Sequence, residues 1–549
     1  AGHEVELLDS GASRKARRVP IPDMMKEMVP CSDAEDSSPF KLFGRFYHYG
    51  PRFFEIKELI RRSNPDAIGI AALFSAYGKE ALACAEAARQ AAPNATVIMG
   101  GGHASFAPGQ ILRLNFADFC ITGEGEHALP ELLEAVAQGR DPSLIPGVCG
   151  LRQDRSLFRN QPCQVSDIDS LPMPARQLLD LDAYRFQGRR LALILSSRGC
   201  PFRCAFCSAH LTSGNIFRPR NPERVVEEML ECRDRFDIRA FDFEDDNLVV
   251  DTERAECLMH LIIDAFGEEN LRLEAMNGIS SKGLNPSLLR LMKRAGFSRL
   301  NISPLSSTPG LRSSMRRPER LDEVASLPGQ AEKLGFDLTA YLMIGYPGQH
   351  LTEIMDDLCL WAEKPVLLAP SVFYPAPGSP VQLELFPYLD DADAERWALT
   401  RSSLFPETPE GLSRKELRTV FWMVRMANFA RSLVPERDTG RLRELCFHLI
   451  DMAEKAPVDS ARDRGKGARR LSTRFALDTV SRGKVALAYY LKTTIPYGIQ
   501  RIQRGDAGRE WVYRVFPLDA MIGDPRFYTD YGIPGFAGVF PKETPHKRV

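Results

Sequence analysis

The chain has 549 residues, 44% of them hydrophobic, which is enough for two to four domains with ordinary cores. Its formal net charge of −1 argues against general binding of nucleic acids through bulk electrostatics. No apolar run approaches the length of about 20 residues that a membrane helix needs, so we expect no membrane span.

The first 150 residues alternate between expected strands and helices. Strands are expected at residues 67–71, 96–99 and 118–121, and helices at residues 56–63, 79–92 and 127–138. This alternation predicts a doubly wound parallel sheet, and a generic flavodoxin-like fold is the alternative. Residues 1–9 read as a Gly turn that runs into a strand, so we expect the first strand and helix of the fold to be missing from this sequence.

Two expected strands end in glycine-rich turns, which would let the backbone approach a phosphate-bearing ligand closely. One is Gly100-Gly101-Gly102-His103, and the other is Gly123-Glu124-Gly125-Glu126. Neither matches the G-x-G-x-x-G fingerprint of dinucleotide binding or the P-loop. Residues 151–190 contain several prolines and are expected to be an extended linker.

Three cysteines follow a predicted buried strand at residues 191–195. Cys200, Cys204 and Cys207 have C-x3-C-x2-C spacing in a loop marked by Gly and Pro. Three thiolates on one loop can hold three irons of a cubic iron–sulfur cluster and leave the fourth iron open to a small molecule. A Cys3His zinc site that includes His210 is the alternative.

The other nine cysteines are isolated. This scatter is not a disulfide framework, and it favours a reducing, cytoplasmic location. The isolated cysteines are Cys31, Cys84, Cys120, Cys149, Cys163, Cys232, Cys257, Cys359 and Cys446.

Six strand–helix repeats are expected over residues 191–385, which predicts a partial (β/α)6 barrel with its functional groups at the strand ends. Asn221 and Pro222 are expected to cap the helix after the cysteine loop. The strands are expected at residues 191–195, 238–243, 271–276, 299–303, 337–344 and 367–373. Residues 386–549 are expected to form a mainly helical domain, with helices at residues 415–432 and 440–455 among others.

The cysteine loop, with an aromatic residue before its last cysteine, resembles the radical S-adenosylmethionine (radical SAM) family. In that family the amino and carboxylate groups of S-adenosylmethionine chelate the open iron. The resemblance implies that the strand ends of the barrel bind this cofactor, although the family's usual Glu after strand four is missing here. The residues it implicates are Phe206, Asp245, Asp246, Asn247, Ser303, Gly345, Pro347 and Gly348.

Residues 1–150 look like the cobalamin-binding domain that precedes many radical SAM barrels. The resemblance implies that strand-end loops line the tail of cobalamin, with His103 as a loop or tail contact rather than a cobalt ligand. The loop that carries a cobalt ligand in other cobalamin proteins would follow the first strand, which we expect to be missing from this sequence. The residues implicated are Ser75, Gly100, Gly101, Gly102, His103, Ser105, Gly123 and Glu124.

Together these resemblances imply a cobalamin-dependent radical SAM enzyme with three cofactors: a 4Fe–4S cluster, S-adenosylmethionine and cobalamin. Its expected reaction is reductive cleavage of S-adenosylmethionine to a 5′-deoxyadenosyl radical, followed by methylation of an unactivated carbon or phosphorus of a small molecule. An external low-potential donor of the flavodoxin or ferredoxin type would supply the electron. Radical cyclisation or ring rearrangement, and a sensor without turnover, are the alternatives. Arg218 and Arg220 are expected either to meet the substrate or to form salt bridges.

Overall fold

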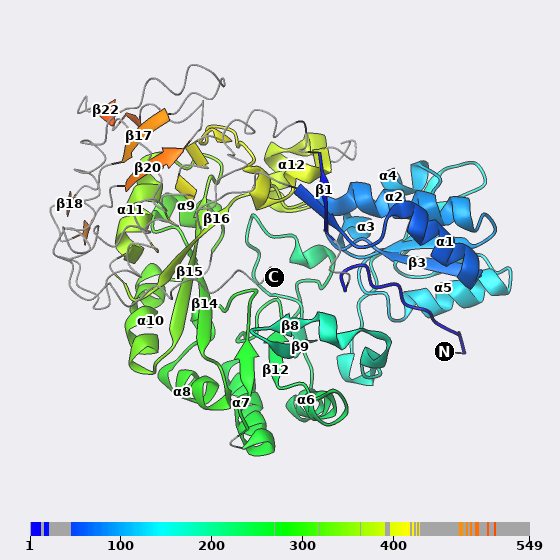
Figure 1. Ribbon diagram of the computed structural model, residues 1–549, viewed down its shortest axis with the longest axis horizontal. Helices are drawn as coiled ribbons and strands as arrows, with labels where there is room; N and C mark the ends of the chain where they lie inside the picture. The colour runs from blue at the N-terminus through cyan, green and yellow to red at the C-terminus, as the bar shows by residue number, and fades with distance from the viewer. Residues whose placement is uncertain are drawn as a thin grey trace. The chain divides into compact units, whose positions relative to one another are not determined.

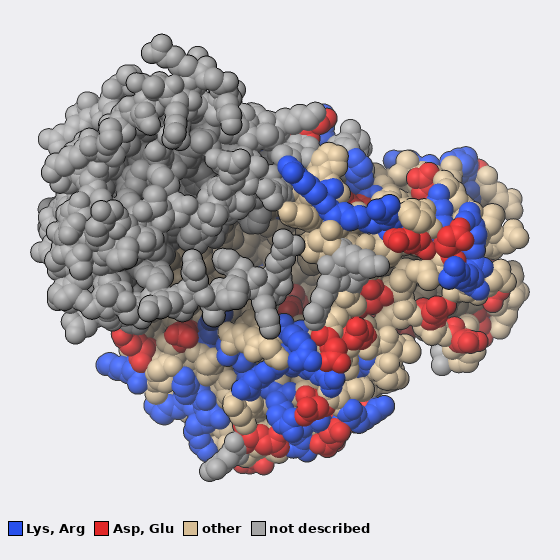
Figure 2. Space-filling model, viewed as in Figure 1, with Lys and Arg blue, Asp and Glu red and all other residues tan. Residues whose placement is uncertain are grey.

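The computed structural model describes residues 2–12, 16–20, 23 and 46–389, except residues 268, 318 and 363, together with residues 396–414 and parts of 416–428 and 471–511. The chain divides into two compact units. The first comprises Ala1–Arg17, Tyr47–Pro347 and Ser371–Pro409, and the second comprises Arg18–Phe46, Gly348–Pro370 and Glu410–Val549. On the face shown in Figure 2, positive and negative side chains are mixed over the described residues, in keeping with the small net charge.

A five-stranded sheet forms the N-terminal part of the first unit, with the order β3-β4-β5-β6-β7 (Figure 1). The first three strands are parallel to one another, and β6 and β7 are antiparallel additions. The strands are β3 (Ala67–Ala71), β4 (Thr96–Gly100), β5 (Phe119–Ile121), β6 (Val148–Leu151) and β7 (Leu157–Arg159). The helices are α1 (Phe53–Ser63), α2 (Gly78–Ala91), α3 (Gly102–Phe106), α4 (Pro108–Arg113) and α5 (Ala128–Ala137).

This sheet confirms the predicted α/β fold and corrects two details. First, β7 lies in the region expected to be a linker, so the sheet continues past the boundary expected at residue 150. Second, residues 2–9 are not a strand, although one was expected there. The strands nearest the N-terminus are β1 (Ala16–Val19) and β2 (Phe46–Tyr49), which pair with each other.

The six strand–helix repeats of the barrel are present, which confirms the partial (β/α)6 prediction. Its strands form two sheets, ordered β13-β12-β9-β8 and β14-β15-β16, and parallel bridges link Leu273 to Phe297 and Ile279 to Ile302. The six barrel strands are β9 (Arg189–Ile194), β12 (Ala240–Phe243), β13 (Arg272–Glu274), β14 (Arg299–Leu305), β15 (Asp337–Ile344) and β16 (Leu367–Val372), and β8 (Arg185–Phe186) is an antiparallel addition beside β9. The helices are α6 (Pro222–Phe236), α7 (Thr252–Phe266), α8 (Pro286–Ala295), α10 (Leu321–Lys333) and α11 (Leu351–Ala362), with the short α9 (Pro309–Ser314) after β14.

The ends of the barrel helices follow ordinary capping chemistry. The side chain of Asn221 accepts a hydrogen bond from the backbone N–H of Glu223, and Pro222 occupies the first turn of α6, as predicted. Asn285 caps α8 in the same way. That helix ends at Gly296, whose φ of 118° is accessible to glycine at little cost.

One hydrophobic core cluster joins the N-terminal sheet to the end of the barrel. Its buried members include Val97 and Met99 of β4, Met343 of β15, and Phe373 and Trp397 from the segment that follows the barrel. Burial of this shared apolar surface is the dominant favourable contribution to holding the two domains together.

The expected mainly helical region at residues 386–549 is described only in part. After α12 (Pro380–Leu385) come short 3-10 turns, including Arg396–Leu399. The expected helix at residues 440–455, and much of the one at 415–432, lie outside the described residues. The described residues between 471 and 511 are strands, which the helical expectation did not include: β17 (Leu471–Phe475), β18 (Thr479–Val480), β19 (Lys484–Val485), β20 (Tyr489–Thr493), β21 (Ile502–Gln503) and β22 (Glu510–Trp511). Among the described helices, none has the length and apolar character that crossing a membrane requires.

Candidate active site

The cysteine loop lies between two short strands, β10 (Ser197–Arg198) and β11 (Arg218–Pro219), that pair with each other. Gly199 opens the loop with a φ of 83°, and a Cβ there would lie 2.1 Å from the carbonyl oxygen of Ile216. Only glycine therefore fits this position. The Gly199 N–H also donates to the Asp246 carboxylate at 2.9 Å, which ties the loop to the end of β12.

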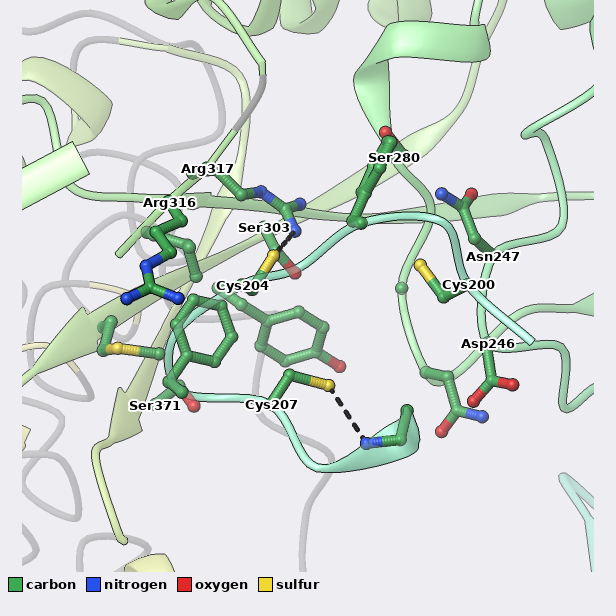
Figure 3. Close-up of a pocket in the computed structure, with 18 of the residues that line it drawn as sticks. Cys200, Cys204, Cys207, Asp246, Asn247, Ser280, Ser303, Arg316, Arg317 and Ser371 are labelled. Carbon is green, nitrogen blue, oxygen red and sulfur yellow. Dashed lines mark hydrogen bonds between the residues drawn. The ribbon is translucent and has the colours of Figure 1, made fainter. Parts of the chain in front are cut away.

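All three loop cysteines line one cavity of about 850 Å³ (Figure 3). The barrel contributes to the wall from β14 and β15, from the last two residues of β16, and from the segments that follow β12 and β13. These lining residues include Asp246, Asn247, Met276, Ser303, Tyr341, Met343, Ser371 and Val372. The cavity thus lies where enzymes of this barrel type place their chemistry.

The thiols are suited to holding a cluster. Burial raises the pKa of Cys200 and of Cys207, but an N–H group or a cation faces two of the sulfurs. The Arg317 guanidinium donates to Cys204 Sγ at 3.7 Å, and the Ala209 N–H donates to Cys207 Sγ at 3.5 Å. Such donors stabilise thiolates and the cluster sulfurs that thiolates bind.

The distances between the possible metal-binding side chains bear on the alternative of a zinc site. His210 also lines the cavity, and burial lowers its pKa. Within the part of the chain that the structure describes, however, no three His, Cys, Asp or Glu side chains lie close enough to hold one metal ion. A cubic cluster binds each cysteine through a different iron, so three separated sulfurs on one cavity fit a cluster better than a single zinc ion.

The three polar residues after β12 have different surroundings. Asp245 is buried beneath the loop, where its carboxylate accepts hydrogen bonds from Ser196 and Ser197, and it does not line the cavity. Burial raises the pKa of Asp245, although these hydrogen bonds oppose the shift. Asp246 and Asn247 do line the cavity, and the buried Oδ1 of Asn247 accepts no hydrogen bond from the described part of the chain.

The other implicated barrel residues divide in the same way. Phe206 and Ser303 line the cavity. The expected turn after β15 is present, with left-handed φ angles of 80° at Gly345 and 72° at Gly348, but Gly345, Pro347 and Gly348 are not among the lining residues.

The polar residues at the strand ends of the N-terminal sheet form hydrogen bonds with one another and with the backbone of neighbouring loops. Ser75 Oγ and His103 Nδ1 are 3.0 Å apart. Ser105 Oγ donates to the carbonyl of Gly101 and accepts from the N–H of Gly123, both at 3.0 Å. In the structure these side chains join the loops to one another, and their contact with cobalamin stays a prediction.

His103 is fully buried against Trp397, with ring centroids 4.2 Å apart. Burial lowers the pKa of His103 to about 4, so the ring is neutral at physiological pH. The glycines beside it are required by the protein's own backbone. A Cβ at Gly101 would meet the Ala72 carbonyl oxygen at 2.9 Å, and one at Gly102 would meet that of Leu73 at 2.6 Å.

The carboxyl end of β3 nevertheless offers a surface to a large ligand. Leu73, Phe74 and Tyr77 are 61%, 65% and 52% exposed, and a Cβ on Gly100 would meet open space. Exposed apolar side chains in such a cluster are typical of binding surfaces. These residues therefore fit a bulky, partly apolar cofactor such as cobalamin.

Glu124, which we expected to line the cobalamin tail, is engaged with an arginine of the barrel in the structure. It forms a buried ion pair with Arg218, and Arg198 pairs with Glu126 at 2.6 Å. Burial alone would raise the pKa of Glu124, but hydrogen bonds from Arg218 and the Val165 N–H, and the charges of Arg198 and Arg218, lower it overall. Of the two outcomes left open for Arg218 and Arg220, the structure shows salt bridges, the second with Glu228 at 2.7 Å.

Sequence reasoning missed three arginines that line the cavity: Arg203, Arg316 and Arg317. Arg203 stands inside the cysteine motif, where it could have been noticed. The other two follow the fourth barrel strand. No local sequence pattern predicts that Arg317 contacts Cys204, which lies 113 residues earlier in the chain.

Two family models match the chain. The B12 binding domain matches residues 49–133, and the radical SAM superfamily matches residues 194–358. The chain carries a B12 binding domain followed by a radical SAM domain.

Several known proteins resemble this chain. An uncharacterized methyltransferase of Pyrococcus horikoshii is 28% identical over 306 residues, which are 55% of this chain and 65% of that protein. The cytidylyl-2-hydroxyethylphosphonate methyltransferase of Streptomyces wedmorensis is 24% identical over 377 residues, 63% of this chain and 66% of that protein. The chain thus matches just under two thirds of the length of these relatives.

The fold also resembles a solved structure. The radical S-adenosylmethionine methyltransferase TsrM from Kitasatospora setae, with cobalamin and a 4Fe–4S cluster bound, superposes with a TM-score of 0.52. That match covers 61% of this chain and 66% of TsrM at 19% identity, so it establishes a shared fold.

Proposed function

We propose that this protein is a cobalamin-dependent radical SAM methyltransferase acting on a small molecule. The observation that carries the proposal is the convergence of Cys200, Cys204 and Cys207 on one cavity at the strand ends of a partial barrel. The relatives named as methyltransferases, and the match of residues 49–133 to a B12 binding domain, support methyl transfer. When bound, the cluster and S-adenosylmethionine supply a 5′-deoxyadenosyl radical, and cobalamin supplies the methyl group.

In this proposal the loop cysteines hold the cluster, and the residues after β12 position its ligands. Asp245 orders the start of the loop through Ser196 and Ser197, and Asp246 fixes Gly199. Asn247 Oδ1, which is buried and has no donor among the described residues, would accept a hydrogen bond from an N–H group of bound S-adenosylmethionine. Leaving such an acceptor unpaired is unfavourable, so ligand binding relieves an existing desolvation penalty.

The remaining walls keep the reaction away from water. Leu305, Met343, Val372 and Phe373 are buried and line the cavity together with the cysteines. An apolar lining protects a reactive radical from side reactions. A low-potential donor of the flavodoxin or ferredoxin type would deliver the electron from outside.

The test is anaerobic reconstitution followed by product analysis. The protein should be brown, contain about four irons, and form 5′-deoxyadenosine and methionine when reductant and S-adenosylmethionine are added. With substrate and cobalamin, S-adenosylhomocysteine should appear in step with the methylated product. Without cobalamin, slow formation of 5′-deoxyadenosine should remain and the methylated product should not form.

Each alternative gives a different result. A colourless protein with one zinc ion would contradict the cluster. Product formed without accompanying S-adenosylhomocysteine would favour cyclisation or rearrangement, and cofactor binding without any 5′-deoxyadenosine would favour a sensor.

A further inference from the structure

We propose that the substrate carries an anionic group, a carboxylate, phosphate or phosphonate, on an apolar body, and that Arg203 and Arg316 bind that group. The proposal rests on the proposed function and names the class of its substrate. It is carried by the charges that line the cavity and by how they are paired.

Four side chains on the cavity wall carry a formal charge besides any thiolates: Arg203, Arg316, Arg317 and Asp246. Two of them are already engaged. Asp246 accepts the N–H of Gly199, and Arg317 contacts both Glu319 and Cys204. The two guanidinium groups of Arg203 and Arg316 are therefore the charged groups without such a contact among the described residues, and they outweigh the single negative charge of Asp246.

This lack of partners distinguishes them from the other arginines around the cysteine loop. Arg198, Arg218 and Arg220 each form ion pairs with acidic side chains. Among the residues that the structure describes, no acidic side chain pairs with Arg203 or Arg316, and both are exposed to the cavity. A guanidinium presents a planar fork of donors that matches a carboxylate or phosphate.

The backbone at Arg316 separates it from its neighbour. Its φ is 54°, a left-handed conformation that a residue with a Cβ adopts only at an energetic cost. Figure 3 shows the result: Arg317 points to Cys204, whereas Arg316 turns away from that sulfur, on the side of Ser371. Strained backbone at a binding site often serves to orient a side chain. Here it gives the two arginines different tasks.

The rest of the wall defines the body of the substrate. Leu305, Ile279, Val372 and Phe373 are buried apolar residues that line the same cavity, and Met276 is a partly exposed one. A ligand that satisfies both the arginines and these side chains must be amphipathic. A neutral polar ligand would make no apolar contacts with this wall. A neutral apolar ligand would displace water from the two guanidinium groups without supplying hydrogen bonds in its place.

S-adenosylmethionine also has a carboxylate, so the test keeps that cofactor saturating. The protein reconstituted with cluster and cobalamin is titrated with 4-phenylbutyrate, phenyl phosphate and the uncharged 4-phenylbutyramide, and binding is followed by nuclear magnetic resonance. The two anions should bind at least about tenfold more tightly than the amide. Equal affinity for the acid and the amide would overturn the proposal.

Variants assign the effect to the two arginines. R203Q and R316N should each weaken binding of the anions by about tenfold and leave the amide unaffected. Asn is chosen at position 316 because it tolerates a left-handed backbone, so the variant should fold. R203K should retain part of the affinity. The matched control is R290Q, on the exposed face of α8, which should bind all three probes as the wild type does.

Two results would show that the proposal is wrong: unchanged anion binding in both variants, or a raised requirement for S-adenosylmethionine in 5′-deoxyadenosine formation. The second would mean that the arginines bind the cofactor's carboxylate. Formation of 5′-deoxyadenosine by the wild type without any probe tests the proposed function separately, so the two failures are distinguishable.

Discussion

Arg218 donates to both carboxylate oxygens of Glu124, at 2.9 Å to one and 2.6 Å to the other, and both side chains are buried. Glu124 follows β5 in the B12 binding domain, and Arg218 belongs to β11, at the base of the cysteine loop. The strand β11 pairs with β10, which immediately precedes Gly199 and Cys200. This ion pair therefore connects the B12 binding domain to the cysteine loop.

We predict that breaking the pair uncouples the two domains. E124Q should still bind cobalamin and the cluster, but binding of cobalamin should no longer slow hydrogen exchange in residues 199–216, which should exchange about tenfold faster than in the wild-type complex. Hydrogen exchange of this peptide, with cobalamin occupancy read by absorbance, measures the effect. E124Q leaves the buried Arg218 without its charged partner, which should also lower the stability of the fold. The double variant E124Q/R218M removes both charges, so it should regain stability but should not regain the cobalamin-dependent protection from hydrogen exchange.

E227Q, in the exposed pair of Arg224 and Glu227 on α6, is the matched control and should behave as the wild type. Cobalamin-dependent protection that survives in E124Q would show that the ion pair only stabilises the fold.

The cysteines should be indispensable individually. C204A removes one iron ligand and the sulfur that Arg317 contacts, so we expect iron content to fall below half and 5′-deoxyadenosine to be undetectable. The comparison variant is C257A, which replaces an exposed cysteine on α7 and should keep full iron content and colour. Iron analysis and chromatography of the nucleoside measure both. Normal iron and turnover in C204A would mean that another residue holds the cluster.

Arg317 should set the reduction potential of the cluster. Its positive charge beside Cys204 stabilises the more negative reduced state, so R317M should lower the potential by about 60 mV, the equivalent of a tenfold change for one electron. R317K keeps the charge and should shift it less. Redox titration followed by electron paramagnetic resonance provides the measurement.

Since Arg317 also pairs with the buried Glu319, the double variant R317M/E319Q separates loss of the cluster contact from loss of folding. A wild-type potential in both R317M and the double variant would contradict this prediction.

The sequence allowed the local features of this molecule to be predicted, and the reasons are visible at particular residues. Asn221 and Pro222 predicted the start of α6, and Gly199 predicted a turn, because helix capping and left-handed backbone conformations depend on a few neighbouring residues. The barrel strands were found from their apolar runs and were misplaced by only a few residues at their ends.

Contacts between distant residues could not be predicted in the same way. The pair of Glu124 and Arg218 spans 94 residues, and no periodic pattern links the two. No feature of the sequence therefore predicted Arg218 as a partner of Glu124. Likewise, no propensity places Trp397 against His103, because that contact depends on how the segment after the barrel packs onto the N-terminal sheet.

The final prediction concerns Asp242, a buried carboxyl group on β12 whose Oδ1 accepts the N–H of Met276. Burial, with the negative charges of Glu244 and Glu274, raises its pKa to about 7, well above the ordinary value of about 3.9 that holds in the unfolded chain. Between these values the folded protein holds a proton that the unfolded chain has lost, so the stabilisation is complete below about pH 4 and is lost as the pH rises through about 7.

D242N keeps an acceptor for Met276 and has no proton to lose, so it should melt above the wild type at pH 8, by about 2 °C or more, and close to it at pH 4. Thermal unfolding from pH 4 to 8 measures this, with D66N, at the exposed Asp66, as the control. If D242N loses stability as steeply as the wild type over this range, Asp242 is not the group responsible.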